Sequence, residues 1–326
     1  MNQKYNFVAA TYNLKLDRVT NRGIRLFNDL RLSSAESIQG IIDEQLKDIM
    51  GILEYEQLLK GPYYYAIGKG SSERDLHLNE NALLFLDYFL TEIQIINNLL
   101  WLVKDHSINT ETAYIKVESG GEITLHSNHR PATFFNAKGK RDVTEFTTKE
   151  LKYAISLKEK LFEEESFDSS HKSYTSSENV IKASRIDRTF YFLQTARAEG
   201  FLPLRISNFV TILETLLSTT KGDVTHKLRE RMAWLLGESF ENRLEIYKLI
   251  GNVYSVRSNC VHGSSMPKGF RTNEKLEELS ISFEQLVRRL ILKIIGEEDI
   301  FKIYKDNKED EIESWLLELC LGSNEK

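Results

Sequence analysis

In the carboxyl-terminal half, residues 244–263 read Leu244-Glu-Ile-Tyr-Lys-Leu-Ile-Gly-Asn-Val-Tyr-Ser-Val-Arg257-Ser-Asn-Cys-Val-His262-Gly263. Its apolar residues recur every three or four positions, which is typical of a helix with a wide buried face. They fall on two lines: Tyr247, Ile250, Tyr254 and Val261, and then Ile246, Leu249, Val253, Val256 and Cys260. Gly263 suits the carboxyl-terminal cap, so we predict a helix over Phe240–His262.

Arg257 lies on the first of these lines, where another apolar residue would be expected. Because an uncompensated buried charge is costly, its guanidinium must be paired or must face a polar pocket. His262 follows five residues later, in the last turn. Arginine holds phosphate oxygens with a fixed fork of donors, and histidine exchanges protons near neutral pH. Without a nearby carboxylate cluster, the pair suits metal-free phosphoryl transfer, such as attack of an RNA 2′-hydroxyl on its own phosphate.

The same two residues also have a structural interpretation. An Arg and a His at one fixed spacing occur by chance in many chains of this composition. Arg257 would then pair with a core glutamate, and His262 would only cap carbonyls at the helix end. The spacing alone leaves both interpretations open.

Three motifs in order resemble the Apea-like HEPN domains, a branch of the HEPN ribonuclease superfamily. Tyr254–Gly263 resembles the signature in which an Arg precedes a His-Gly pair by four to six residues. Upstream, Ile212–Ser218 resembles the helix with a Glu-x-Leu-Leu core, and His226–Gly237 resembles the helix ending in Ala-x-Leu-Leu-Gly. Three motifs together are far more specific than one. The pattern departs at Ser258, where many active members carry Asn, Asp or His, and Asn259 comes one position later.

The resemblance implies a metal-independent endoribonuclease without a cofactor, which cuts RNA to leave a 2′,3′-cyclic phosphate and a 5′-hydroxyl. It assigns phosphate stabilisation to Arg257 and proton transfer to His262, with Ser258 and Asn259 as supporting residues. Many such proteins act in bacterial defence against phage or as toxins. The expected partners are therefore tRNA or mRNA, a phage-derived trigger or an antitoxin. The alternative from another class is a catalytically silent HEPN-like module that binds RNA, a nucleotide or a protein and serves in dimerisation.

The geometry of a helix favours a homodimer with a composite site. Residues five apart point about 140° away from one another, because each residue turns the helix by about 100°. Arg257 and His262 of one chain therefore do not converge on one phosphate. A twofold axis beside them would bring two copies of the helix around one cleft. The line Ser255, Ser258 and His262 would border that cleft.

Composition indicates a predominantly helical globular protein. Hydrophobic residues make up 41% and charged residues 28%, and four prolines leave room for long helices. The net charge of −5 argues against a general polyanion binder, but residues 221–275 carry ten Lys and Arg against six Asp and Glu. Within this basic segment, the loop after His262 adds Lys268 and Arg271 as candidate RNA-binding residues. Ordinary solvated surface explains the segment equally well.

Cysteine usage and hydropathy indicate a cytoplasmic protein that does not cross a membrane. Cys260 and Cys320 form no metal motif or disulfide framework. The amino-terminal residues show no signal-peptide pattern. The most apolar stretch, Leu83–Val103, contains acidic and amide residues that argue against a transmembrane helix.

The amino-terminal half is expected to mix strands and helices. Strands arranged as a hairpin are predicted for Tyr5–Leu16 and Gly23–Leu32, followed by a helix from a capping box at Ser33 and Glu36 to about Leu59. A long apolar helix follows from Asn79 to about Lys104. Further on we expect a hairpin around Gly120-Gly121, with strands Thr112–Val117 and Glu122–His126, and a helix over Thr148–Glu165. His126 and His129 lack Cys or acidic neighbours, so we interpret them as surface residues and predict no metal site.

The fold prediction is an α+β amino-terminal domain over residues 1–165, a polar linker or loop over 166–179, and an all-α HEPN-like bundle over 180–326. The linker is Ser-rich and has no apolar periodicity. The amino-terminal domain would sense or dock a partner. Helices are predicted in the bundle at Val180–Glu199, Leu204–Ser218, Val224–Leu236, Phe240–His262, Asn273–Gly296 and Asp310–Leu321.

Overall fold

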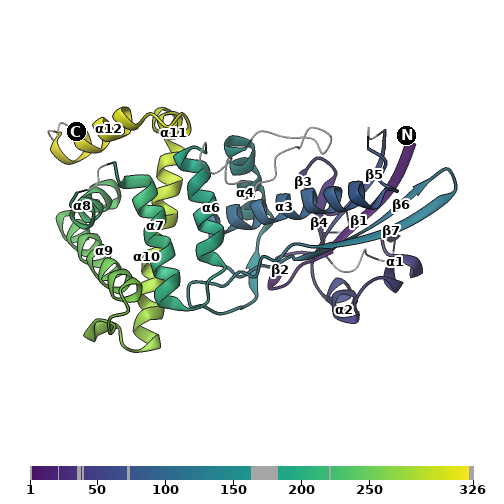
Figure 1. Cartoon of the computed structure of the whole chain (residues 1–326), viewed down its shortest axis with the longest axis horizontal. Coiled ribbons are helices and arrows are strands. Elements are labelled where there is room, and N and C mark those ends of the chain that lie inside the picture. Colours follow the sequence, from purple (N-terminus) through teal and green to yellow (C-terminus); the bar gives the residue numbers. More distant parts are fainter. Residues whose placement is uncertain are drawn as a thin grey trace. The chain divides into compact units, whose positions relative to one another are not determined.

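The computed structural model describes residues 2–20, 22–34, 38, 40–71, 74–162, 183–219 and 222–322, which form two compact units (Figure 1). The sheet unit contains the described residues up to Phe134 and those from Arg141 to Phe162. The helical unit contains Phe135–Lys140 and the described residues from Ala183 onward. An α+β region followed by an all-helical region is therefore confirmed. The linker predicted over 166–179 lies outside the described residues.

A six-stranded antiparallel sheet, in the order β3-β4-β5-β1-β6-β7, is the centre of the sheet unit. Its strands are β1 (Asn2–Ala10), β3 (Ile24–Phe27), β4 (Leu30–Ser33), β5 (Tyr63–Ser71), β6 (Thr112–Ser119) and β7 (Glu122–His129). A separate parallel pair joins β2 (Leu14–Leu16) to β8 (Thr144–Phe146). Among the described strands of the large sheet, β3 and β7 lie at its two edges.

Both faces of the sheet are covered by helices, and strand β1 shows how. Phe7 stacks on Phe89 of α3 (Asn79–Val103), with ring centroids 4.7 Å apart. The next residue, Val8, points to the other face and packs in a cluster with Leu46 of α1 (Glu44–Asp48) and Leu58 of α2 (Ile52–Lys60). Because neighbouring strand residues face opposite sides, a strand buried on both faces is apolar at successive positions.

The chain folds differently from the prediction over residues 5–59. The two predicted strands are not partners, since β1 pairs with β5 and β6, while Gly23–Leu32 folds on itself as the β3–β4 hairpin. The helix predicted from Ser33 to Leu59 is also wrong. Ser33 ends β4, and its hydroxyl donates to the carbonyl of Thr20 instead of capping a helix. The segment instead forms two short helices, capped at Asp43 and begun after Gly51; Glu36 lies outside the described residues.

The predicted long helix and the second hairpin are confirmed. Helix α3 starts at Asn79 and ends at Val103, and β6 and β7 turn at Gly120 and Gly121, both with positive φ. By length and composition α3 is the one helix among the described residues that could cross a membrane, and 72% of that span is buried inside the protein. Helix α4 (Thr148–Leu161) packs beside it, capped by Thr147 and Glu150.

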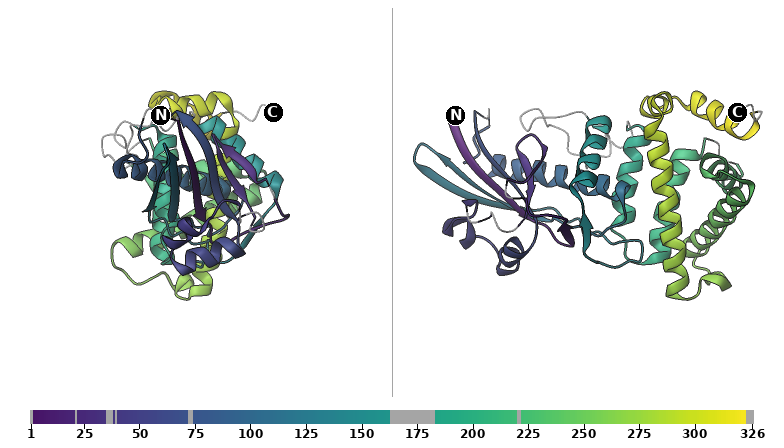
Figure 2. Two further views of the ribbon diagram at one scale, coloured as in Figure 1. Left: turned by 90° about the vertical axis from the view of Figure 1, so that its right-hand side faces the viewer. Right: turned by 180° about the vertical axis from the view of Figure 1, so that it is seen from behind.

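The helical unit contains the helices that the apolar periodicity predicts and one more. They are α6 (Arg185–Arg197), α7 (Leu202–Leu217), α8 (Val224–Leu236), α9 (Phe240–Val261), the 3₁₀ turn η2 (Lys268–Phe270), α10 (Asn273–Gly296), α11 (Glu298–Lys305) and α12 (Glu309–Leu321). Helix α11 was not predicted; it is short and buries only Phe301 and Tyr304. Figure 2 shows α10 running alongside α7, and Phe209 of α7 packs edge-on against Phe283 of α10.

Buried arginines join the ends of these helices. Arg205 of α7 is fully buried, donates to the carbonyls of Ala196, Arg197 and Glu199, and pairs with Glu284 of α10. Arg231 similarly reaches the end of α7 at Leu217 and pairs with Glu313 of α12. A cation at a helix carboxyl end offsets the partial negative charge of the free carbonyls. These contacts fix α7 between its neighbours, and α7 in turn supports α9.

Candidate functional site

The predicted site lies on α9, which packs against α7, α8 and α10. Its fully buried residues are Ile246, Ile250, Val253 and Val256. They follow the predicted spacing of three to four residues, but the buried face is narrower than expected. Tyr247, Leu249, Tyr254 and Cys260 are half-buried, and Val261 is 55% exposed. The last turn of α9 therefore emerges from the core, and His262 lies at this emerging end.

Gly263 ends the helix in a complete Schellman motif. The amide of Ser264 donates to the carbonyl of Asn259 at 2.8 Å, and the amide of Gly263 donates to Cys260. Gly263 has a φ of +68°, a left-handed conformation that glycine adopts without a steric penalty. The predicted cap is thus confirmed, and it holds His262 in a defined position as the last half-helical residue, with its amide on the Ser258 carbonyl at 3.0 Å.

Arg257 is half-buried and paired, as its position in the apolar line requires. Its Nη2 lies 3.9 Å from Oε1 of Glu214 on α7, a loose ion pair with both side chains about one quarter exposed. Its guanidinium also lies over the ring of Tyr254, 5.5 Å from the centroid. At 3.9 Å the pair is held by charge and not by a short hydrogen bond. The donors of Arg257 are therefore not saturated by Glu214 and stay available for an anion.

His262 differs from Arg257 in its surroundings. Its side chain is exposed, and within the described part of the chain its imidazole takes part in no hydrogen bond or ion pair. Five helical positions separate it from Arg257, which places the two side chains on different sides of α9. The structure thus pairs Arg257 with Glu214, whereas helix geometry turns His262 of the same chain towards another side of α9.

The supporting residues have mixed surroundings. Ser258 is half-buried, and its carbonyl accepts the amide of His262. The Asn259 amide donates to the carbonyl of Ser265, so it ties down the loop that follows the helix. In that loop Lys268 is exposed, and the exposed Arg271 uses its Nε to donate to the carbonyl of Met266. Asn259 thus has a structural role, whereas Lys268 is exposed and has no ion-pair partner among the described residues.

Two features near the site were not predicted from the sequence. The first is the role of Glu214 as the partner of Arg257, although an arginine on the buried face of a helix requires an acidic partner. The second is a cluster between α8 and α9, in which the Arg229 guanidinium stacks 3.8 Å above the Tyr247 ring. A side chain at Gly251 would come within 3.1 Å of that guanidinium, so glycine leaves room for the stack. His226 completes it, 3.3 Å from the Tyr247 hydroxyl.

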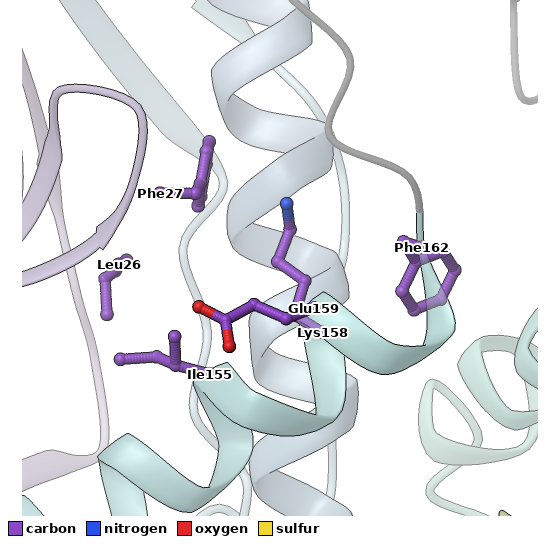
Figure 3. A pocket seen from close by; sticks show the side chains of 6 residues that line it. All are labelled: Leu26, Phe27, Ile155, Lys158, Glu159 and Phe162. Atoms are coloured by element: carbon purple, nitrogen blue, oxygen red, sulfur yellow. The ribbon is translucent and has the colours of Figure 1, made fainter.

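Two hollows among the described residues lie away from Arg257 and His262. A groove of about 340 Å³ lies between α9 and α10 and is lined by Asn242, Glu245, Ile246, Leu249, Ser282, Gln285, Leu286 and Arg289. A smaller cavity of about 70 Å³ lies in the sheet unit (Figure 3). There Lys158 and Glu159 leave α4 in different directions, and the Lys158 ammonium pairs with Glu92 at 2.7 Å. This lysine therefore serves a buried ion pair. No group of three or more His, Cys, Asp or Glu able to hold a metal occurs within the described residues.

Comparisons with known proteins give no identification. No family model, no curated protein and no solved structure matches the chain significantly.

Proposed function

We propose that the helical unit is a metal-independent HEPN-like endoribonuclease, a cytoplasmic effector of bacterial anti-phage defence or a toxin. The observation that carries the proposal is the state of the two residues on α9. Arg257 is half-buried and forms a loose ion pair with Glu214, which leaves hydrogen-bond donors of its guanidinium available. The His262 imidazole is exposed at the ordered end of α9. The basic segment around them and the order of the three motifs support the same interpretation.

The chemistry needs only arginine and histidine side chains and the RNA. The 2′-oxygen forms a bond to phosphorus while the bond from phosphorus to the 5′-oxygen breaks. A His262 imidazole takes the proton of the 2′-hydroxyl, and a second imidazole donates a proton to the leaving 5′-oxygen. The guanidinium of Arg257 stabilises the charge that develops on the phosphate oxygens. The products are a 2′,3′-cyclic phosphate and a 5′-hydroxyl.

The second imidazole would come from a second copy of the chain. Because Arg257 and His262 of one chain point to different sides of α9, one copy alone does not surround a phosphate. An isologous dimer with its axis beside the end of α9 would supply two arginines and two histidines to one cleft. The exposed Val261, next to His262, offers apolar surface for such a contact.

A second candidate is a binding module without catalysis. It is favoured by the contacts of Arg257, which already has an acid and an aromatic ring as partners, and by Ser258 in place of the usual polar helper. Such a module would bind RNA, a nucleotide or a protein through the same basic surface.

The decisive experiment incubates the purified chain with total RNA and with tRNA, with and without EDTA. Cleavage should survive the chelator, because no step uses a metal ion. Arg257→Ala and His262→Ala should each lower the rate by at least ~100-fold, whereas His129→Ala, which removes an exposed histidine of the sheet unit, should not. Arg257→Lys keeps the charge but loses the fork of donors, so it should restore little activity.

Three outcomes would count against the nuclease. Activity that EDTA removes and Mg²⁺ restores would show a metal mechanism. Undiminished cleavage by folded His262→Ala would exclude the proposed proton transfer. A wild-type chain that retards RNA in a gel but never cuts it would establish the binding module instead.

The composite site is tested by mixing subunits. Arg257→Ala and His262→Ala chains, each inactive alone, form heterodimers that retain one arginine and one histidine on different copies. Mixing should therefore restore part of the activity, and only part, because the cleft regains a guanidinium beside an imidazole but lacks the second imidazole. Light scattering should show a dimer at micromolar concentration. A strictly monomeric chain with full activity at every concentration would rule out the dimer.

A further inference from the structure

A row of polar side chains joins the edge strand β7 to the start of α3. On β7, residues 124, 126 and 128 share one face, because alternate residues of a strand point the same way. Each makes a hydrogen bond to the segment that begins α3, which lies against β6 and β7 (Figure 1). The three bonds join Thr124 to His77, His126 to Asn79, and Asn128 to the carbonyl of Leu83. We call these residues the polar seam.

Two imidazoles of the seam are oriented by their Nδ1 atoms. The Nδ1 of His126 lies 3.2 Å from Oδ1 of Asn79, and the Nδ1 of His77 lies 3.0 Å from the Thr124 hydroxyl. An amide oxygen only accepts hydrogen bonds, so the His126 Nδ1 carries the proton. In the neutral ring the lone pair is then on Nε2. The Thr124 hydroxyl can accept from His77 in the same manner.

The Nε2 atoms of both rings are buried and have no hydrogen-bond partner within the described residues. Leaving a buried polar atom without a hydrogen bond is costly, so two such atoms in one seam require an explanation. The two rings are also neighbours. Thr124 and His126 are two residues apart on β7, and their respective partners His77 and Asn79 are two residues apart on the other side of the seam.

We propose that His77 and His126 bind one divalent transition-metal ion, such as Zn²⁺, through their Nε2 atoms. Imidazole nitrogen suits Zn²⁺, Cu²⁺ and Ni²⁺, whereas Mg²⁺ and Ca²⁺ prefer oxygen ligands. Histidines that bind metals usually donate the other ring N–H to a carbonyl, carboxylate or water, and Asn79 provides such an acceptor here. Two protein ligands leave coordination positions for water or for a ligand from a partner.

The neighbouring His129 does not belong to this site. It lies three residues after His126 on β7, so it points to the other face of the strand. It is exposed, and its Nδ1 bonds to the hydroxyl of Thr112. His126 and His129 thus face different sides of β7, and in the proposed site His126 acts with His77, which lies 49 positions earlier. His129 is a matched control.

Bound metal would fasten β7 to the start of α3, and a ligand that binds only the folded state stabilises it. The test uses the full chain, stripped of metal with EDTA and dialysed, and titrates ZnCl₂ by calorimetry and thermal unfolding. We expect one ion per chain and a higher Tm. His77→Gln and His126→Gln should each weaken binding at least ~10-fold, Asn79→Ala by ~10-fold, and His129→Gln should have no effect. Mg²⁺ should not compete.

A second measurement needs no variant that could disturb the fold. In wild-type protein labelled with ¹⁵N-histidine, Zn²⁺ should shift the Nε2 resonances of two imidazoles and leave their Nδ1 atoms protonated. Failure of Zn²⁺ to bind the wild type, binding that persists unchanged in a folded His77→Gln, or shifts confined to other histidines would each overturn the proposal. The result is independent of ribonuclease activity, since the reaction proposed for α9 uses no metal.

Discussion

At the scale of single residues, two arginine–glutamate pairs of the helical unit show how burial decides the role of a charge. Arg205 and Glu284 are both fully buried, with Nε 2.6 Å from Oε1, and Ser280 also donates to Glu284. Arg257 and Glu214 are 3.9 Å apart and partly exposed. The first pair fixes three helices to one another. The second holds an arginine in a loose ion pair, as the proposed phosphate-binding role of Arg257 requires.

The same substitution in each pair separates these roles. Glu284→Gln removes the charge that balances buried Arg205, so we expect a loss of about 3–5 kcal/mol in unfolding free energy. Glu214→Gln should cost less than about 1 kcal/mol, because solvent screens a loose and partly exposed pair. Chemical denaturation of both variants measures the difference. Equal losses would show that Arg257 belongs to the core in the same way as Arg205.

At the scale of elements, the end of α9 is the feature on which the candidate site depends. The helix stops because Gly263 adopts a left-handed conformation, and the Schellman bonds then turn the chain towards η2. Asn259 holds the following loop through Ser265. His262 is thereby fixed at the boundary between helix and loop, where its side chain is exposed while its backbone is ordered.

Gly263→Ala tests this arrangement. An L-residue at a φ of +68° costs roughly 1–2 kcal/mol, so the variant should lose about that much stability or unwind the last turn of α9. Gly269→Ala in the same loop is the control, since Gly269 has no positive φ and a Cβ there meets nothing within 4 Å. If the proposed function holds, Gly263→Ala should also slow RNA cleavage, because His262 moves. Identical denaturation midpoints for the two variants would contradict this account of the cap.

At the scale of the whole molecule, both units contain tyrosines that burial keeps protonated. In the sheet unit, burial and the nearby Asp29 charge raise the pKa of Tyr5 to about 12, and burial raises the pKa of Tyr64 further. In the helical unit burial likewise raises the pKa of Tyr304, whose hydroxyl donates to the carbonyl of Leu216 at 2.7 Å.

These tyrosines predict alkaline unfolding of both units. Below pH 10 the folded and unfolded chains are equally protonated at these groups, and their stabilising contribution is complete. As the pH rises from 10 towards 12, the unfolded chain ionises first and stability falls. Tyrosinate absorbance should therefore rise together with the loss of helical circular dichroism. Tyr304→Phe should cost about 1 kcal/mol at neutral pH and reduce the alkaline loss. Full ionisation of all tyrosines near pH 10 with the fold intact would contradict the prediction.

Local patterns in the sequence were enough to predict most helices of the carboxyl-terminal half. The bounds of α8 and α10 agree with the prediction, because apolar periodicity and the residues that flank a helix are properties of neighbouring positions. The carboxyl-terminal end of α9 was predictable from Gly263 for the same reason. The requirement that Arg257 be paired also followed from its place in the apolar line.

Which residues from distant parts of the chain meet became known from the tertiary structure. It placed β1 between β5 and β6, since strand pairing joins segments that the sequence keeps far apart. It ended β4 at Ser33, because pairing with Tyr63 outweighs a local capping motif. It supplied Glu214 to Arg257 and His77 to Thr124, partners 43 and 47 positions away. Apolar periodicity and capping residues predict the structure of one helical turn or one strand. The free energy of burial and of charge pairing depends instead on every segment that packs around a residue.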